Sequence, residues 1–325
     1  MRPIRLAVDV MSGDHGLPTV IAGVLAACEK SIVPLKVYLC GHADGIKACL
    51  KEHSAIPSLN QQHCSLKIIS CTDALLRTAS PARFWKTAPQ SSIIRCISLQ
   101  QQGQVDASVS AGDTGILMSA AIFLIGRNKQ YSRPALAALL PTITNRPVLV
   151  LDVGANTECR SEHLVDFARM GIDYLVRSGN KNPTVSLLNV GSESTKGPRA
   201  VREAAVALKQ LDCAYSGFVE GSHVLAGKSD IVVCDGFTGN VLLKACGSFY
   251  KLVARVLEQP SGVTMGSVSG NPVAMSILNP DAYGAVPLLG INGIVLKAHG
   301  SSSSGAIANA VKAAVTLIQQ NQTKS

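Results

Sequence analysis

The chain has 325 residues, and its 47% hydrophobic content is enough to bury a sizeable core, which excludes a disordered protein. Its 28 Gly residues and 4% aromatic content favour helices packed on a buried parallel sheet over an all-β architecture. The formal net charge of +9 suits an acidic protein partner or an anionic membrane face, but no basic run is interleaved with aromatic residues, so nucleic acid is not expected as a partner.

Short β-branched runs alternate with helical patterns along the chain. The alternation predicts an α/β fold of three layers, α/β/α, around a mostly parallel sheet. We expect one compact catalytic unit over residues 1–325, with a two-lobed form of it as an alternative. The predicted strands and helices, in chain order, cover residues 4–10, 18–30, 37–40, 66–70, 91–102, 107–110, 115–125, 148–153, 162–177, 184–190, 199–211, 231–234, 241–258, 293–297 and 304–319.

Residues 259–290 interrupt this alternation with five Gly and four Pro residues. They predict an irregular arm that is either functional or a packed dimer contact. No apolar stretch near the N-terminus has the length of a signal peptide, and the longest apolar helical run, 116–125, is well short of the roughly 20 residues that span a bilayer. We therefore expect a cytoplasmic protein without a transmembrane helix.

The ten cysteines are scattered along the chain without a Cys-x-x-Cys pair. This pattern predicts buried thiols, with neither a disulfide nor a zinc site. Five of the histidines, at 42, 53, 63, 163 and 223, have no partner at metal-ligand spacing, so no metal is expected. A Gly-x-Ser-x-Gly nucleophile motif does not occur, which argues against a serine hydrolase.

Six of the predicted strands are followed by a loop that combines Gly with polar residues. In open parallel sheets the carboxyl ends of the strands converge on one edge where ligands bind, and Gly lets backbone N–H groups approach an anion closely. One such loop would be ordinary turn chemistry, whereas six of them favour a single shared pocket. The loops are residues 9–16, 110–115, 152–156, 189–193, 234–240 and 297–301.

The loops, in this order, resemble the PlsX family of phosphate acyltransferases, beginning with Asp9 to Gly16, which is similar to that family's Asp-x-Met-Gly-Gly-Asp-His-Gly signature. The resemblance extends from about Leu6 to Ala310. Further matching segments are residues 110–115, 133–141, 151–156, 162–164, 195–197, 232–237, 239–240 and 297–302.

The resemblance implies transfer of a fatty acyl group from acyl carrier protein to inorganic phosphate, giving acyl phosphate for phospholipid synthesis. It also implies a homodimer without a cofactor, in a fold similar to phosphotransacetylases and isopropylmalate dehydrogenases. The acyl phosphate would serve a downstream membrane glycerol-3-phosphate acyltransferase, which makes peripheral contact with the inner face of the membrane an expectation as well.

This reaction needs positioned substrates and hydrogen-bond donors rather than a protein nucleophile, because a thiol of pKa near 8.5 leaves readily. The catalytic candidates are Lys196, Asn240, His299 and His15. Helix capping is the structural alternative for Asn240 and for Asp14, and loop stabilisation is the alternative for Asp9, Asp152 and Asp235. The candidates for binding phosphate or substrate are Asp14, Gly16, Gly112, Asp113, Thr114, Gly115, Asn156, Gly197, Asp235, Gly239, Gly300 and Ser301.

The chain departs from the family pattern at four places. Ser12 replaces a Gly, Leu17 is inserted before Pro18, and residues 84–90 lack a short basic run. Asp113 stands where the family has Asn, and a carboxylate beside a phosphate site is repulsive unless it points away or is protonated. Asp113 and the altered residues 84–90 keep open a non-catalytic membrane-associated scaffold as an alternative function.

A CoA-dependent phosphotransacetylase is a further alternative, because related folds support different reactions. An NAD-dependent and metal-dependent decarboxylating dehydrogenase is disfavoured. The sequence has neither an Asp-x-x-x-Asp pair for a divalent ion nor a Gly-x-Gly-x-x-Gly loop after the first strand.

Overall fold

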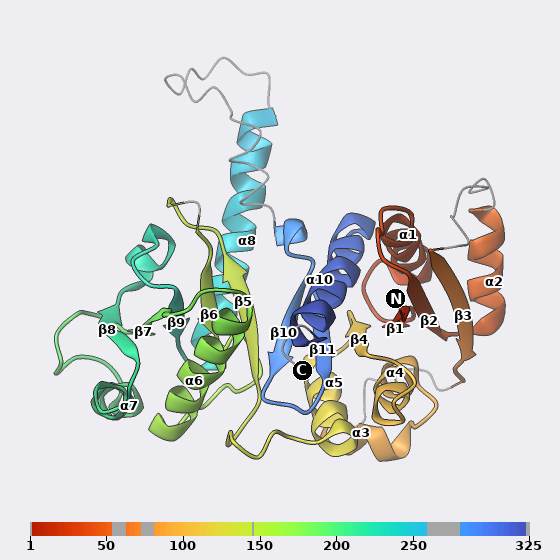
Figure 1. Cartoon of the computed structure of the whole chain (residues 1–325). Helices are drawn as coiled ribbons and strands as arrows, with labels where there is room; N and C mark the ends of the chain where they lie inside the picture. Colours follow the sequence, from red (N-terminus) through yellow and green to blue (C-terminus); the bar gives the residue numbers. More distant parts are fainter. Residues whose placement is uncertain (1, 54–62, 73–80, 145, 259–279, 323–325) are drawn as a thin grey trace. The chain divides into compact units, whose positions relative to one another are not determined.

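The computed structural model describes residues 2–53, 63–72, 81–144, 146–258 and 280–322 (Figure 1). The chain divides into two compact units. Unit 1 consists of Met1–Pro134 and Tyr283–Ser325, and unit 2 consists of Ala135–Ala282. The prediction of a single catalytic unit over residues 1–325 stays a prediction.

Unit 1 is built on a sheet with the strand order β3-β2-β1-β4-β11-β10. Neighbouring strands are parallel except for β10 and β11, which are antiparallel. The parallel pairs place the ends of β1, β4 and β11 at one edge. The strands are β1 (Ile4–Asp9), β2 (Leu35–Gly41), β3 (Cys64–Ser70), β4 (Ala107–Ser110), β10 (Ala285–Leu289) and β11 (Ile294–Ala298).

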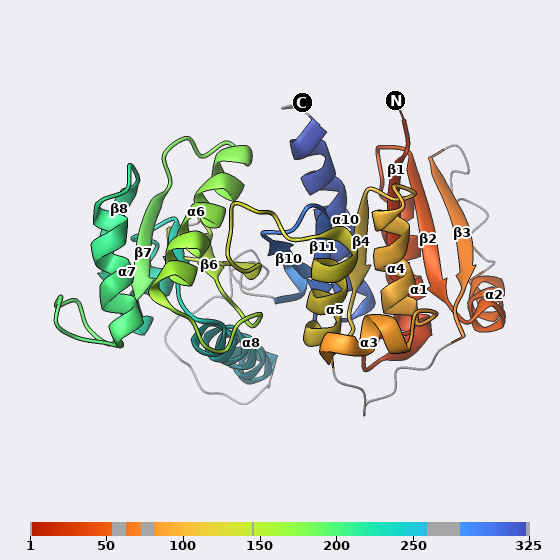
Figure 2. The same ribbon diagram turned by 90° about the horizontal axis from the view of Figure 1, so that it is seen from below.

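Helices cover both faces of this sheet (Figure 2). On one face, α1 (Gly16–Glu29), α2 (Ala43–Glu52) and α10 (Ser304–Gln322) contribute to a core that also contains Leu6, Val8, Val109, Leu296 and Ala298. On the other face lie α4 (Ser92–Gln101), α5 (Thr114–Ala120) and the π-helical turn η1 (Ala121–Ile125), with α3 (Pro81–Thr87) packed against α5. The alternation of side chains along each strand therefore serves two separate cores.

The strands of unit 2 follow the order β5-β6-β9-β7-β8. Its strands are β5 (Ala135–Leu140), β6 (Val148–Leu151), β7 (Thr184–Leu188), β8 (Ala214–Val219) and β9 (Ile231–Val233). Only the β5–β6 pair is antiparallel among the described pairs. The helices are α6 (Ser161–Arg177), α7 (Arg199–Lys209), α8 (Gly236–Glu258) and the 3-10 turns η2 (Gly221–Ala226) and η3 (Pro280–Ala282).

The predicted α/β class, with a mostly parallel sheet between helical layers, is confirmed in both units. Several elements were missed: α2, α3, β5, β8 and β10. Of the irregular arm predicted at residues 259–290, residues 259–279 lie outside the described residues. The remaining residues, 280–290, contain η3 and β10. This end of the range includes a regular strand because β10 pairs with β11.

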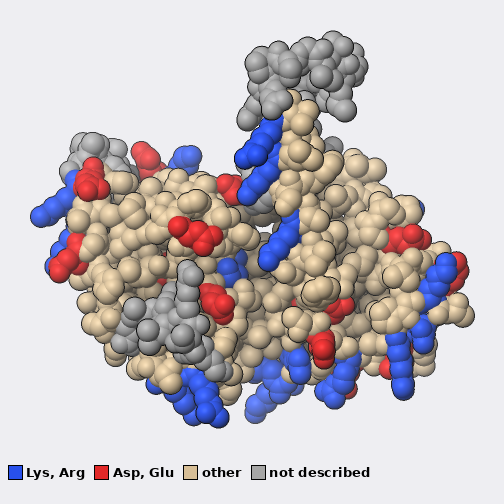
Figure 3. Space-filling model, turned by 180° about the vertical axis from the view of Figure 1, so that it is seen from behind, with Lys and Arg blue, Asp and Glu red and all other residues tan. Residues whose placement is uncertain are grey.

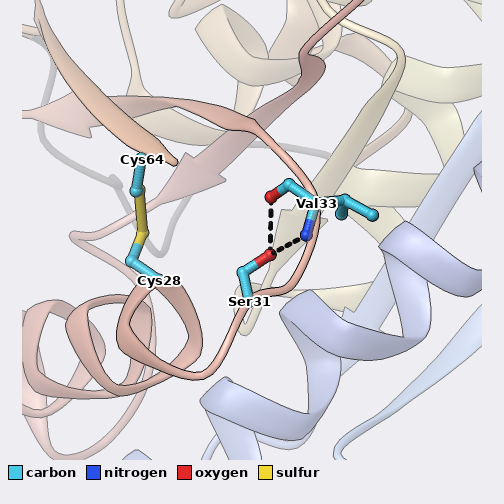
Figure 4. The surroundings of a disulfide bond; sticks show 4 residues. All are labelled: Cys28, Ser31, Val33 and Cys64. Atoms are coloured by element: carbon cyan, nitrogen blue, oxygen red, sulfur yellow. Dashed lines mark hydrogen bonds between the residues drawn. A yellow bond between two sulfur atoms is a disulfide. The ribbon is translucent and has the colours of Figure 1, made fainter. Parts of the chain in front are cut away.

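A disulfide joins Cys28, near the end of α1, to Cys64, the first residue of β3 (Figure 4). The expectation of no disulfide is therefore wrong. Packing of α1 on the sheet brings the two Cα atoms to 5.7 Å, within the range that a disulfide spans. The turn after α1 is held by Ser31, whose hydroxyl donates to Val33 O at 2.8 Å and accepts from Val33 N at 3.3 Å. A separation of 36 residues gives no spacing signal for such a pair.

Helix α8 presents apolar side chains to solvent, among them Phe249 (66% exposed) and Leu252 (58% exposed). The exposed basic residues of the same helix are Lys244, Lys251 and Arg255, and Figure 3 shows basic side chains along one side of it. Within the described ranges, no helix is both long enough and apolar enough to cross a bilayer.

Candidate functional site

Asp9 ends β1 and fixes the loop that follows. Its Oδ2 accepts a hydrogen bond of 2.6 Å from the hydroxyl of Ser110, the last residue of β4. Its Oδ1 accepts from the backbone N–H groups of Met11 at 3.1 Å and Ser12 at 3.3 Å. Asp9 and Ser110 are each 1% exposed. The carboxylate therefore ties the loop after β1 to the end of β4.

The loop after β11 joins the same edge of unit 1. Asp14 N donates to Gly300 O at 2.7 Å, which connects the loops after β1 and β11. A small pocket lies at these loops, and Ser12, His15, Ala111 and Gly300 are among the residues that line it. Three of the six predicted loops thus come together within unit 1.

Two exposed histidines stand on these loops. The Nδ1 atom of His299 accepts from Ser301 N at 3.1 Å and lies 2.9 Å from the Ser301 hydroxyl. A neutral His299 ring therefore carries its proton on Nε2. His15 directly precedes α1 and its side chain makes no capping hydrogen bond, while the helix begins at Gly16 rather than at residue 18.

Asp113 is the N-cap of α5. Its Oδ1 accepts from Ile116 N at 2.9 Å, and the carboxylate is exposed. Gly112 N donates to the Ser110 hydroxyl at 3.0 Å, so this amide is engaged within the loop. In the described part of the chain, the N–H groups of Thr114 and Gly115 have no acceptor, as is usual in a first helical turn.

Lys297 lies at the end of β11 and was not among the predicted site residues. Its ammonium donates to Ala298 O. Burial lowers the pKa of Lys297 to about 8, although Asp113, Asp14 and Asp9 act in the opposite direction. The sequence held one signal for it, because Lys297 is the only Lys or Arg in the three loops of unit 1.

Asp152 organises the loop after β6 in unit 2. Its Oδ1 accepts from the N–H groups of Leu136, Gly154 and Ala155 at 3.0–3.1 Å. Its Oδ2 accepts from the backbone and side-chain nitrogens of Asn156 at 2.7 and 2.8 Å. The side chain is fully buried, and this burial raises its pKa. The predicted binding residue Asn156 is thus held by Asp152.

The loop after β9 packs against the Asp152 loop. Gly236 N donates to Asn156 O at 2.7 Å, and a Cβ atom at Gly239 would collide with Asp152 O, so only Gly fits there. Asp235 accepts from Thr238 N at 2.8 Å and from its hydroxyl at 2.9 Å, which stabilises the start of α8. Asn240 lies in the second turn of α8, not at its N-cap, and its side chain lies near Gly154.

Lys196 lies in the loop after β7. Its ammonium is 2.7 Å from a carboxylate oxygen of Glu193, and both side chains are about half exposed. Hydrogen bonding to Glu193 raises the pKa of Lys196. The amide of Asn189 donates to Lys196 O at 3.0 Å and to Gly191 O at 3.2 Å, which holds the loop in place. Gly197 has a φ of +87°, and a Cβ atom there would collide with Asn189 Oδ1.

The structure thus groups the predicted residues by unit. Unit 1 brings together Asp14, His15, Gly16, Gly112, Asp113, Thr114, Gly115, His299, Gly300 and Ser301. Unit 2 brings Asn156, Asp235, Gly239 and Asn240 together, with Lys196 and Gly197 after the strand next to β9. The single pocket predicted from all six loops stays a prediction. Among the described residues, no three His, Cys, Asp or Glu side chains are placed to hold a metal ion.

Comparisons with known proteins agree with the sequence motifs. Residues 4–325 match the model of a family described as "Fatty acid synthesis protein". Proteins named phosphate acyltransferase from Heliobacterium modesticaldum and Bacillus licheniformis are each 36% identical to the chain over 98% of its length, and the matches cover 95% and 96% of those relatives.

Solved structures with a similar fold include a phosphotransacetylase from Streptococcus pyogenes, with a TM-score of 0.62, 15% identity and coverage of 99% of this chain and 95% of that one. A 4-hydroxythreonine-4-phosphate dehydrogenase from Klebsiella pneumoniae has a TM-score of 0.57, 14% identity and coverage of 98% and 100%. The predicted kinship with transacetylase and dehydrogenase folds is confirmed. The chain belongs to the PlsX family of phosphate acyltransferases.

Proposed function

We propose that this chain is an enzyme that transfers a fatty acyl group from acyl carrier protein to inorganic phosphate, forming acyl phosphate for phospholipid synthesis. The observation that carries the proposal is the identity of 36% over 98% of the chain to relatives named phosphate acyltransferase. The reaction requires no cofactor. Its substrates are an acyl carrier protein thioester and phosphate.

In the reaction, an oxygen of the phosphate dianion attacks the thioester carbonyl carbon and forms a tetrahedral oxyanion. Collapse of this intermediate breaks the C–S bond, so acyl phosphate and a thiolate are released. The thiolate then takes a proton from a nearby acid or from water, since its conjugate thiol has a pKa near 8.5. Positioning and donors aimed at the oxyanion account for the catalysis.

In unit 1, the N–H groups of Thr114 and Gly115 are the proposed donors to phosphate oxygens. The carboxylate of Asp113 is directed to Ile116 N, which reduces its repulsion of the anion. His299 is proposed as a further donor, because its hydrogen bond from Ser301 N leaves the proton of a neutral ring on Nε2. His15 lines the pocket and is proposed as the proton donor to the thiolate.

In unit 2, the amide of Asn240 is proposed to hold the acyl or phosphate oxygen. Its support is the packing of α8 against the Asp152 loop, which fixes the backbone on which Asn240 stands. Lys196 is proposed to attract the anion, and its salt bridge with Glu193 tempers that attraction in the free protein.

One assay tests the proposed function and separates its alternatives. Purified chain is incubated with acyl carrier protein thioester and phosphate, with long and short acyl-CoA as competing donors, and phosphate-dependent thiol release is followed. Release from the carrier thioester is expected. A strong preference for short acyl-CoA would identify a CoA-dependent phosphotransacetylase, and no release from any donor would favour the non-catalytic scaffold. Asn240→Ala should abolish most of the activity, while Asn180→Ala, on the turn after α6, should not.

A homodimer and peripheral contact with the inner, cytoplasmic face of the membrane, near the downstream glycerol-3-phosphate acyltransferase, are part of the proposal. The exposed Phe249 and Leu252 of α8, beside the basic Lys251 and Arg255, support such a contact. The double variant Phe249→Ser/Leu252→Ser should reduce flotation with anionic vesicles or convert a dimer to monomer in light scattering. If neither changes, this helix makes neither contact.

A further inference from the structure

The edge of unit 1 is rich in carboxylates. Its three loops, residues 9–16, 110–115 and 297–301, carry Asp9, Asp14 and Asp113 but only one Lys or Arg, which is Lys297. A phosphate dianion approaching three carboxylates would be repelled unless a cation offsets them. The composition of these loops therefore makes Lys297 the only Lys or Arg that they themselves can offer to an anionic ligand.

The sheet register places Lys297 among the polar groups of this edge. Lys297 pairs with Ser110 of the parallel strand β4, so the two side chains lie on the same face of the sheet. Its neighbours Leu296 and Ala298 belong to the core formed with α1 and α10, which leaves Lys297 on the opposite face. Ser110 in turn donates to Asp9. Asp9, Ser110 and Lys297 thus form a polar row across the ends of β1, β4 and β11.

The ammonium of Lys297 is held without an ion pair. Within the described residues, its hydrogen-bond acceptor is Ala298 O and no carboxylate oxygen lies within 4.0 Å. Lys196 differs, because its ammonium is neutralised by Glu193 at 2.7 Å. An ammonium has three N–H donors, and one of them is directed to Ala298 O. Lys297 can therefore donate further hydrogen bonds to a ligand.

The charged groups around Lys297 come from several elements. Asp113 precedes α5, Asp9 ends β1, and Asp14 lies in the loop after β1. All three carboxylates raise the pKa of Lys297, whereas burial lowers it. Strand β10 has no titratable residue, α4 carries Arg95 and α10 carries the exposed Lys312. The surroundings thus keep a charged lysine at the edge of the sheet without pairing it.

A second observation points to a ligand at the same loops. The hydroxyl of Ser12, one of the departures from the family pattern, has no hydrogen-bond partner among the described residues, although the residue is only 2% exposed. Ser12 lines the pocket formed with Gly13, His15 and Gly300. Lys297 is not among the residues that line this pocket. The Ser12 oxygen lies beside the end of β4, because a Cβ atom added at Gly112 would come within 2.8 Å of it and within 3.1 Å of Ser110 Oγ. Buried hydroxyl groups are normally paired, so the Ser12 hydroxyl is available to a polar ligand at the end of β4.

We propose that the ammonium of Lys297 binds a phosphate group of the substrates and supplies the positive charge that the edge of unit 1 otherwise lacks. This inference rests on the proposed function. The phosphate group is either the attacking inorganic phosphate or a phosphate carried by the thioester donor, and both offer the same anionic oxygens to the lysine.

Steady-state kinetics of thiol release test the proposal, with Lys297→Met, Lys297→Arg and the control Lys312→Met on the exposed surface of α10. Loss of one charge-assisted hydrogen bond is expected to raise the KM for phosphate by about tenfold or more in Lys297→Met. Lys297→Arg should recover part of the affinity, and the control should match the original chain. A raised KM for acyl-CoA alone, absent with an acyl N-acetylcysteamine thioester, would assign the lysine to the donor's phosphate. A loss of kcat with both KM values unchanged would overturn the proposal.

Phosphate binding without a thioester donor separates failure of the inference from failure of the proposed function. Inorganic phosphate should raise the Tm of the original chain above its value in chloride of equal ionic strength, and the rise should be smaller in Lys297→Met. If the chain releases no thiol but shows this difference, the proposed function fails and the lysine still binds phosphate. An equal rise in both proteins would overturn the inference.

Discussion

The hydroxyl of Ser110 donates to Asp9 over 2.6 Å, and this hydrogen bond joins the ends of β1 and β4 where both residues are 1% exposed. The same hydroxyl accepts from Gly112 N at 3.0 Å, so a single serine connects the Asp9 carboxylate to the loop that leads into α5. The two strand ends therefore hold their loops as one arrangement. Disturbing it should affect stability and substrate affinity together.

Replacing Ser110 with Ala leaves Asp9 Oδ2 and Gly112 N without this partner inside the protein. The expected loss of unfolding free energy is about 1–3 kcal/mol, because an unpaired buried polar group costs its desolvation. Urea unfolding followed by circular dichroism measures it, with Ser65→Ala on the exposed side of β3 as the control. Equal midpoints for the two variants would show that the hydrogen bond contributes nothing to stability.

Asp113 combines helix capping with an electrostatic effect on Lys297. Asp113→Asn keeps a good N-cap but removes the carboxylate that most favours protonation of Lys297, so the pKa of that lysine should fall further below about 8. Protonated lysine binds the anion, and affinity for phosphate is therefore lost as pH rises through the pKa of Lys297. The variant should show this alkaline loss at a lower pH than the original chain.

The measurement for Asp113 is the KM for phosphate between about pH 6.5 and 9.5, a range that brackets the lysine pKa. Asp113→Ala should shift the pH dependence in the same direction and also cost about 1 kcal/mol of stability through loss of the cap. If the pH dependence stays in place in both variants, Asp113 does not influence the group that binds phosphate.

Gly197 is required by the loop that carries Lys196. Gly197→Ala introduces a Cβ atom against Asn189 Oδ1 in a backbone with φ of +87°, so the amide that holds Lys196 O must move. Gly179→Ala is the matched control, because its φ is +102° but nothing lies within 4 Å of the new Cβ. Both variants carry backbone strain of about 1 kcal/mol, and only Gly197→Ala should also raise the KM for phosphate. Equal effects on KM would mean that the position of Lys196 is unimportant.

The fold class could be predicted from the sequence because β1, β4, β6 and β9 are short runs with β-branched residues, each followed by a Gly-containing loop. Strand β5 could not, since its sequence Ala-Leu-Ala-Ala-Leu-Leu has high helix propensity and becomes a strand only by pairing with buried β6. Strand β10 could not be predicted either, because Pro287 lacks an N–H group and disfavours a strand, and β10 forms by pairing with β11. In both β5 and β10, pairing with a neighbouring strand outweighs the local conformational preference of the sequence.

The candidate site was predictable where Gly and polar residues follow a strand, as at Asp14 and Gly300. Lys297 was not predicted as a site residue because a lysine at the end of a strand is ordinarily solvated. Its burial depends on packing that its neighbours in sequence do not reveal. The hydrogen bond from Ile116 N to the Asp113 carboxylate could not be predicted from the sequence either, because capping depends on the residue at which α5 begins.

Lys297 should cost the protein stability. The pKa of this lysine is about 8 in the folded state, below the value of about 10.4 in an unfolded chain. The protonated lysine is therefore less favourable in the folded chain than in the unfolded chain, which lowers the free energy of unfolding at neutral pH. The penalty is present below the folded pKa and is relieved as pH rises toward the unfolded value, where both states bear a neutral amine. Lys297→Met should therefore be more stable than the original chain at pH 7, by up to about 3 kcal/mol.

Urea unfolding at pH 7 and at about pH 10 checks this, since the advantage of Lys297→Met should shrink at the higher pH. Lys312→Met on the exposed face of α10 serves as the control and should show no such trend. A variant that gains stability while losing affinity for phosphate would show that the charge is kept at the edge of the sheet for its ligand, because a group placed there for folding would not weaken the fold. A less stable Lys297→Met at pH 7 would instead assign the lysine a structural role.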